Sequence, residues 1–262
     1  MDWKTVWDNM GERVFYTGVD HGMLYRLDNK NAYTNGVPWN GLTSVTESPD
    51  GAEATDLWAD NIKYASFRSA EKFGGTIEAY MFPEAFAECD GSKEIVPGVR
   101  IGQQARQKFG LSYRTKIGDD VHGDSAGYEI HLVYGASASP SEKQYQTTND
   151  SPDAATMSWE FDTDPVTVTG YQPTSNLVID SRTVATDKLA KLEAVLYGSY
   201  SVLDSSPEDW STGYNKYYEK DATGAYKIIT ADSAPVFSAG KYYQAVEARL
   251  PLPDEVKSIL TA

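Results

Sequence analysis

The sequence predicts a mainly β fold, and two observations carry this prediction. Apolar and polar residues alternate with a period of two through much of the first two thirds of the chain, as in strands with a buried face. Gly, Asn, Asp and Pro interrupt this alternation at short intervals, which favours tight antiparallel connections over helical crossovers. We therefore expect an antiparallel β-sandwich or partly closed barrel with one flanking helix, plus a small aromatic-rich satellite module.

The clearest strand pattern runs from Tyr128 to Tyr134. Alternation there predicts one buried sheet face, with Glu129 and His131 on the opposite face and four apolar residues in the core, namely Tyr128, Ile130, Leu132 and Tyr134. Similar patterns predict further strands at Thr76 to Phe82, Phe109 to Thr115, Ser158 to Asp162 and Leu177 to Asp180.

Only one internal helix has a clear period. Residues 187–197 place Leu189, Leu192, Val195 and Leu196 on one stripe. Thr186 or Asp187 is the expected N-cap, and Gly198 the expected C-terminal stop. A second, short helix is expected to begin at Pro253, because its fixed φ suits a first helical turn and two acidic residues follow it.

The composition of the sequence changes after residue 198, where aromatic residues become frequent. The segment from Ser199 to Gln244 holds Trp210, Phe237 and seven of the chain's 18 tyrosines. Its paired tyrosines, at 217–218 and 242–243, flank a hairpin expected through Asp221-Ala222-Thr223-Gly224. We therefore divide the chain into a main β domain at 1–198, a Tyr-rich β module at 199–245 and a C-terminal arm at 246–262.

The aromatic residues of this module have two interpretations. Their rings are suited to stack on the apolar faces of sugars, which predicts a carbohydrate-binding surface. A small domain also needs large aromatic side chains to build any core, and this second interpretation is favoured.

The composition indicates a globular chain and argues against several classes of function. Hydrophobic residues make up 40% and charged residues 23% of the 262 residues, which is enough to bury a core. The 38 acidic and 23 basic residues give a net charge of -15, which opposes non-specific binding to nucleic acid. No run approaches the roughly 20 apolar residues of a membrane span, and the first residues lack a signal-peptide pattern. We expect neither membrane insertion nor secretion by signal peptide.

The three histidines give no convincing catalytic or metal site. His21 follows Asp20 in what we expect to be a Gly-containing turn after a strand. His122 lies in an acidic run, Asp119 to Asp124, whose composition suits a divalent metal but whose spacing matches no known ligand motif. We interpret this run as a solvated hairpin loop and expect no metal. A hydrolase that uses His122 and its aspartates is strongly disfavoured, because nothing supplies a matched base or an oxyanion site.

Motifs for nucleophilic and nucleotide chemistry are also absent from the sequence. There is no Gly-x-Ser-x-Gly elbow and no phosphate-binding Gly-x-x-x-x-Gly-Lys, and Gly98 to Gly102 lacks the rest of a dinucleotide fingerprint. Cys89, the only cysteine, excludes an intrachain disulfide and has acidic neighbours that disfavour its thiolate. We therefore expect no catalytic residue, no cofactor and no enzyme.

An ordered series of segments resembles a known family. The segments are Tyr33 to Val45, Gly51 to Leu57, Ala59 to Tyr64, Gly75 to Tyr80, Phe86 to Ser92, Gly102 to Arg106 and Tyr134 to Lys143. Over about residues 11–198 the chain resembles phage major tail proteins, the tail-tube subunits of long-tailed siphophages or prophages of Gram-positive bacteria. The number and order of the segments carry the resemblance, since no single one is diagnostic.

The resemblance implies a structural virion protein that is assembled in the cytoplasm of a bacterial host. Such subunits form rings, usually hexameric, that stack into the tail tube through which DNA is ejected. The implied partners are other copies of the chain and the tape measure, terminator and distal tail proteins, while DNA passes through the lumen without specific binding. The resemblance favours a long non-contractile tail, with the 199–245 module on the outside of the tube.

Three further expectations follow for this chain. The irregular segment from Gly36 to Asp60 is a candidate arm that reaches a neighbouring subunit. Charges separated by more than about 8 Å are screened at physiological salt, so only carboxylates close to the DNA repel it. If the tube prevents DNA from adhering, acidic residues are therefore expected to line the channel. The alternative function, from a different class, is a cell-wall or carbohydrate-binding module carried on a β domain.

Overall fold

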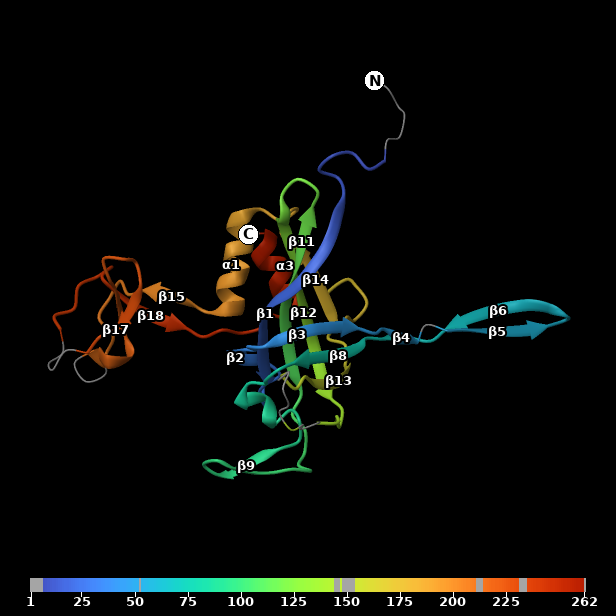
Figure 1. Ribbon diagram of the computed structural model, residues 1–262, viewed down its shortest axis with the longest axis horizontal. Helices are drawn as coiled ribbons and strands as arrows, with labels where there is room; N and C mark the ends of the chain where they lie inside the picture. Colours follow the sequence, from blue (N-terminus) through green and yellow to red (C-terminus); the bar gives the residue numbers. More distant parts are fainter. Residues whose placement is uncertain are drawn as a thin grey trace, which may run out of the picture.

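The computed structural model describes residues 7–51, 53–143, 147, 154–210, 214–230 and 235–261. Its centre is an eight-stranded antiparallel sheet that does not close into a barrel, which confirms the mainly β class (Figure 1). The strand order is β2 (Tyr33–Pro38), β1 (Val14–Leu27), β11 (Phe109–Asp119), β12 (Gly123–Ala138), β13 (Met157–Thr163), β8 (Gly74–Ala79) and β3 (Leu42–Glu47), and β14 (Asn176–Asp180) pairs with β12.

Both faces of the central strands are buried, because the end of the sheet that holds β8 and β3 crosses over β11 and β12 (Figure 1). On β12, Val133 belongs to one hydrophobic cluster, whereas Leu132 and Tyr134 belong to another. The core face predicted for this strand is confirmed, but the prediction of a single buried face is wrong. The side chains of His131 and Glu129, on the other face, are only 13% and 14% exposed.

The first hydrophobic cluster fills the space between the two crossing parts of the sheet. Aromatic rings dominate it: Phe86 lies 5.4 Å from Trp159 and 4.6 Å from Trp39 between ring centroids. Phe86 comes from η1 (Glu84–Ala87), a short 3-10 helix that follows β8. All three aromatic residues are nearly inaccessible to solvent, so they belong to the buried core of the chain.

Two helices cover the opposite face of the sheet, α1 (Thr186–Tyr197) and α3 (Pro253–Thr261). The apolar stripe of α1 packs on the second hydrophobic cluster through Leu189, Leu192 and Leu196, as predicted. Gly198 ends the helix at a φ of 82°, but Ala185 occupies the N-cap. The predicted cap at Thr186 or Asp187 is therefore wrong by one or two residues.

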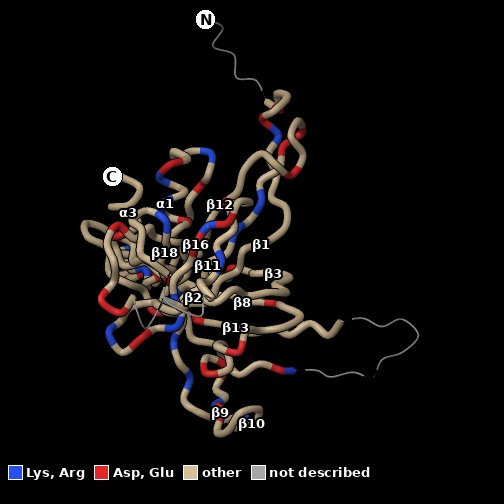
Figure 2. Tube along the Cα trace, turned by 90° about the vertical axis from the view of Figure 1, so that its left-hand side faces the viewer, with Lys and Arg blue, Asp and Glu red and all other residues tan. Residues whose placement is uncertain are grey.

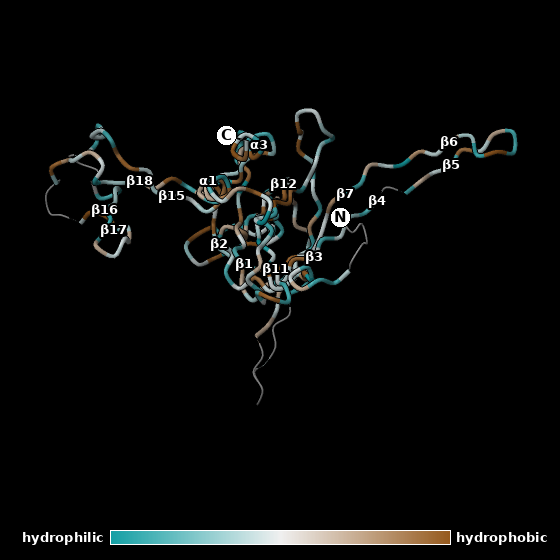
Figure 3. The backbone as a smooth tube through the Cα atoms, turned by 90° about the horizontal axis from the view of Figure 1, so that it is seen from above, coloured by the Kyte–Doolittle hydropathy of each residue, from teal (hydrophilic) through white to brown (hydrophobic). Residues whose placement is uncertain are grey.

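A long hairpin arm leaves the body between β3 and β8, opposite the Tyr-rich segment (Figures 1 and 3). We call it the β4–β7 arm; it consists of β4 (Asp50–Gly51), β5 (Ala54–Ala59), β6 (Ile62–Arg68) and β7 (Glu71–Lys72). The prediction that Gly36 to Asp60 is an irregular arm is wrong. Its first half contributes to β2 and β3 of the main sheet, and the projecting arm continues to Lys72. A second, shorter hairpin consists of β9 (Lys93–Val96) and β10 (Val99–Ile101).

The segment after α1 forms a separate four-stranded sheet. Its strand order is β15 (Ser199–Val202), β18 (Tyr242–Val246), β16 (Tyr218–Lys220) and β17 (Tyr226–Ile228), and η2 (Tyr214–Lys216) precedes β16. The hairpin expected at Asp221 to Gly224 joins β16 to β17, with Gly224 at a φ of 89°. One face of this sheet has its own hydrophobic cluster, which contains Trp210, Tyr217, Ile229 and Tyr242.

Candidate functional site

The outer part of the β4–β7 arm is a two-stranded ribbon whose side chains face solvent. All six residues of β5 and six of the seven residues of β6 are exposed. Asp60 and Asn61, both with positive φ, form the two-residue turn at its tip, and an ion pair of 2.6 Å joins Lys63 to Asp56. An isolated two-stranded hairpin is only marginally stable in water, so this ribbon gains most when another molecule packs on it.

Large apolar side chains cover this ribbon, which Figure 3 shows as hydrophobic stretches along β5 and β6. Trp58 is 68% exposed and Tyr64 is 74% exposed, and the remaining members of the group are Leu57, Ile62 and Phe67. Monomeric proteins seldom leave such a cluster in water, and clusters of this kind mark interaction surfaces. The ribbon is therefore the strongest candidate for an assembly surface.

The beginning of β1 offers a second candidate surface. Val14 to Thr17 pair with β11 on one side, whereas β2 joins β1 only from Met23 onward, so within the described chain the first half of β1 is a sheet edge. Its side chains Val14, Phe15 and Tyr16 are also exposed. An open edge presents backbone N–H and C=O groups that are able to pair with a strand of another chain.

The ionisable side chains are mixed over the molecule rather than gathered in one basic surface (Figure 2). Ion pairs link many of them, including Arg114 with Asp20 at 2.9 Å and Arg182 with Asp180 at 2.8 Å. In both pairs the guanidinium helps to hold the pKa of the carboxyl below its usual value, although partial burial of Asp20 opposes this effect. In these pairs a carboxylate compensates the charge of each guanidinium.

The three histidines lie in different surroundings. His21 lies inside β1, at a local irregularity with a φ of 51°, so the expected turn after a strand is wrong. It contacts Asp20 and the guanidinium of Arg114. His122 lies in the solvated loop between β11 and β12, with its side chain 65% exposed and its Nδ1 2.8 Å from Asp119 Oδ2. The hairpin-loop interpretation is confirmed for residues 120–122 of this acidic run, whereas Asp119 is the buried last residue of β11 and Asp124 belongs to β12.

His131 forms the most elaborate polar cluster of the main sheet. Its ring stacks on Tyr113 at 4.7 Å, its Nδ1 lies 3.1 Å from Glu47 Oε1, and Tyr113 donates a hydrogen bond of 2.6 Å to the same oxygen. The hydrogen bond to His131 is the main reason why the pKa of Glu47 lies below its usual value, and partial burial opposes this effect. The cluster joins β3 to β11 and β12, so it stabilises the crossing of the sheet.

Cys89 is the last of the candidate residues considered from the sequence. Cys89 is buried, which raises the pKa of its thiol to about 12 and keeps it protonated. Among the residues described, no cluster of three or more His, Cys, Asp or Glu side chains is arranged to hold a metal ion. In the same part of the chain, no helix is long and apolar enough to span a bilayer.

Comparisons with known proteins add no family to this description. Neither the models of known protein families nor the curated proteins contain a match to the sequence. The likeness to phage tail-tube subunits thus remains a prediction from the segments quoted above.

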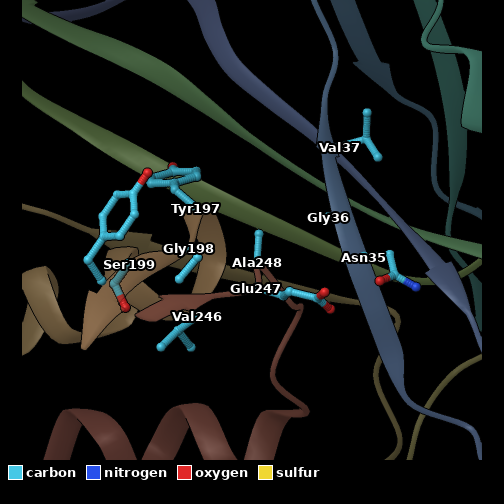
Figure 4. A pocket seen from close by; sticks show the side chains of 11 residues that line it. Asn35, Gly36, Val37, Tyr197, Gly198, Ser199, Val246, Glu247 and Ala248 are labelled. Carbon is cyan, nitrogen blue, oxygen red and sulfur yellow. The ribbon is translucent and has the colours of Figure 1, made fainter. Parts of the chain in front are cut away.

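A hollow of about 440 Å³ lies where the two connections of the Tyr-rich sheet pass β2 (Figure 4). Gly36 of β2 donates a hydrogen bond to the carbonyl of Ala248, and a side chain at position 36 would lie 2.7 Å from Ala248 Cβ. The hollow is lined by backbone, by Asn35 and two tyrosines, and by the single carboxylate of Glu247. Its lining contains no second carboxylate and no histidine.

Sequence reasoning missed the true extent of the arm and the open edge of β1. A local signal for the arm was present, because Asp60-Asn61 favours a tight hairpin turn and lies between two segments of high strand propensity. The open edge of β1 had no such signal, since an alternating pattern does not reveal whether a strand has hydrogen-bonded neighbours on both sides.

Proposed function

We propose that this protein is a non-enzymatic structural subunit that assembles with copies of itself into rings and tubes, in the manner of phage tail-tube proteins. The single observation that supports this most strongly is the β4–β7 arm, with Trp58, Tyr64 and their apolar neighbours in solvent. The arm projects on the side of the body away from the Tyr-rich sheet (Figure 1). Its apolar side chains are therefore available to another molecule.

The arrangement of the candidate surfaces favours a head-to-tail assembly. The ribbon of the arm and the open edge of β1 lie on different parts of the chain, so a contact between them in two copies is heterologous. When two copies make a heterologous contact, each copy keeps one of its two surfaces free to bind a further copy. Repetition of the contact produces closed rings or open helical filaments. Rings that stack give a tube, which agrees with the resemblance seen in the sequence.

The proposal includes a conduit for DNA with an acidic wall, in the tail of a virion. The net charge of -15 supports a lumen that does not retain a phosphate backbone, provided that carboxylates line it. Tape measure, terminator and distal tail proteins are the further partners that this function requires. A basic or neutral lumen in a structure of the assembled tube would remove this part of the proposal and leave self-assembly intact.

Electron microscopy of the purified full-length chain, together with sedimentation velocity over a wide range of concentrations, tests the proposal. We expect a concentration-dependent transition from monomers to rings and tubes of uniform width. An arm variant with Trp58, Ile62 and Tyr64 changed to Ser is expected to remain monomeric and to keep its circular dichroism spectrum. A chain that stays monomeric at every concentration, alone and together with lysate from phage-infected host cells, would contradict self-assembly.

A further inference from the structure

The Tyr-rich sheet has a second face, opposite its hydrophobic cluster, on which tyrosines from all four strands meet. Tyr217 and Tyr242 belong to the cluster, and alternation along the strands puts the tyrosines that follow them, Tyr218 and Tyr243, on the other face. We call this the tyrosine face; it consists of Tyr200, Tyr218, Tyr226 and Tyr243, with Val202, Lys220 and Ile228 beside them.

The rings of the tyrosine face form one continuous aromatic surface. Tyr200 and Tyr226 stack at 4.1 Å between centroids and 12° between planes. Tyr218 meets Tyr200 edge-on at 4.9 Å, and Tyr243 meets Tyr226 edge-on at the same distance. Tyr200, Val202 and Ile228 are between 39% and 47% exposed, whereas Tyr218, Tyr226 and Tyr243 are half-buried, so the surface is partly open to solvent. The mutual contacts hold the rings in place before any ligand arrives.

The hydroxyl groups distinguish this face from the core of the same module. Tyr217 donates a hydrogen bond of 2.7 Å to Asp209, and Tyr242 donates one of 3.3 Å to the carbonyl of Val236. The hydroxyls of the four tyrosine-face residues make no hydrogen bond to any residue that the structure describes. The face thus combines aromatic rings with hydroxyls that are free to bind a polar ligand.

The area of the tyrosine face limits the size of the ligand that it binds. Four strands about 4.8 Å apart and about three residues long cover roughly 150 to 200 Å², whereas a stable protein interface buries about 800 Å² on each partner. A second protein would therefore find too little area here. A nucleic acid is also a poor fit, because stacking sites for single strands need a positively charged groove and Lys220 is the only basic residue on this face.

We propose that the tyrosine face binds a glycan built of pyranose rings. The apolar C–H face of a pyranose packs on the exposed ring of Tyr200, which also stacks on Tyr226, and its equatorial hydroxyls pair with the free phenol groups around it. Lys220, whose Nζ lies 5.3 Å from the centroid of Tyr226, adds a donor at the rim. This function is separate from self-assembly, since the tyrosine face shares no residue with the arm or with the β1 edge.

The test uses the full-length chain on a glycan array that includes neutral, N-acetylated and acidic oligosaccharides and bacterial wall polysaccharides. We expect binding to one class of pyranose glycan, followed by isothermal titration with the best oligosaccharide. Tyr226→Ala and Tyr200→Ala should each weaken that binding roughly tenfold, because each removes one stacked ring. Tyr226→Phe should weaken it less, since the ring is kept and only the hydroxyl is lost.

Two controls make the result decisive. Tyr171→Ala removes an exposed tyrosine of the main body and should leave glycan binding unchanged. Fluorescence of the tryptophans, including buried Trp210, reports whether the module of each variant is folded. Binding to no glycan on the array would overturn the proposal, as would equal affinity of the folded Tyr226→Ala variant and the parent. Loss of self-association in that variant, without an effect on any glycan, would assign the face to contacts between copies instead.

Discussion

Replacing Trp58 on the arm by Ala tests the assembly interface most directly. The side chain is 68% exposed in the single chain. A tryptophan buries roughly 200 Å² when fully enclosed, so on the order of 140 Å² is open to be covered by a neighbouring copy. At about 25 cal/mol per Å² that area is equivalent to about 3 kcal/mol, or more than about a hundredfold in the association constant.

Sedimentation velocity and electron microscopy measure the concentration at which rings or tubes appear. Trp58→Ala should raise this concentration by about two orders of magnitude, whereas Trp58→Phe should raise it much less because an aromatic ring is retained. The urea unfolding curve of the monomer should hardly change, since the side chain contributes little to the folded single chain. Assembly at an unchanged concentration would refute the reasoning that the arm is the interface.

Three further predictions concern the body of the chain. Leu192→Ala, on the buried stripe of α1, should lower the free energy of unfolding by about 2 to 5 kcal/mol in urea, while the change at its exposed neighbour, Lys191→Ala, should alter it by less than about 0.5 kcal/mol. Equal effects of the two substitutions would contradict the packing of α1. Cys89 should resist a thiol reagent at neutral pH in the native chain and react in urea, because burial raises its pKa to about 12; rapid labelling of the native chain would contradict this. The folded pKa of Glu47 lies below its ordinary value of 4.5, so the stability that it contributes is present above that value and is lost as pH falls through the lower, folded pKa. Glu47→Gln should therefore destabilise the chain at neutral pH and progressively less in acid, and a difference independent of pH in urea unfolding would contradict this sign.

Local sequence patterns were sufficient for five of the eight strands of the main sheet and for both helices. The alternation at Tyr128 to Tyr134 identified the residues that face α1 and α3, and Pro253 marked the first residue of a helix. These signals are local because side-chain direction in a strand and φ at proline are set by the residue itself. The prediction of a single buried face failed at His131, which contacts Glu47 of the crossing strand β3, and at Glu129, which accepts a hydrogen bond from Tyr16 of β1.

The candidate surfaces depended more strongly on the tertiary structure. The sequence contains the apolar residues of the arm, but the same alternation also describes an ordinary strand of the main sheet. Only the pairing of β5 with β6 alone, away from the eight-stranded sheet, shows that Trp58 and Tyr64 remain in solvent. The aromatic segment is a similar case, because only the small sheet shows which of its aromatic residues form the hydrophobic cluster and which lie on the opposite face.

The sequence by itself determined a mainly antiparallel β chain with two short helices, a strongly acidic charge and a single cysteine. These properties depend on composition and on the period of neighbouring residues, which are written into the chain directly. The tertiary structure decided which strand edges are open, which apolar side chains are left in solvent, and which tyrosines meet on one face. Those features depend on contacts between residues far apart in the sequence, and no local pattern encodes which strands become neighbours.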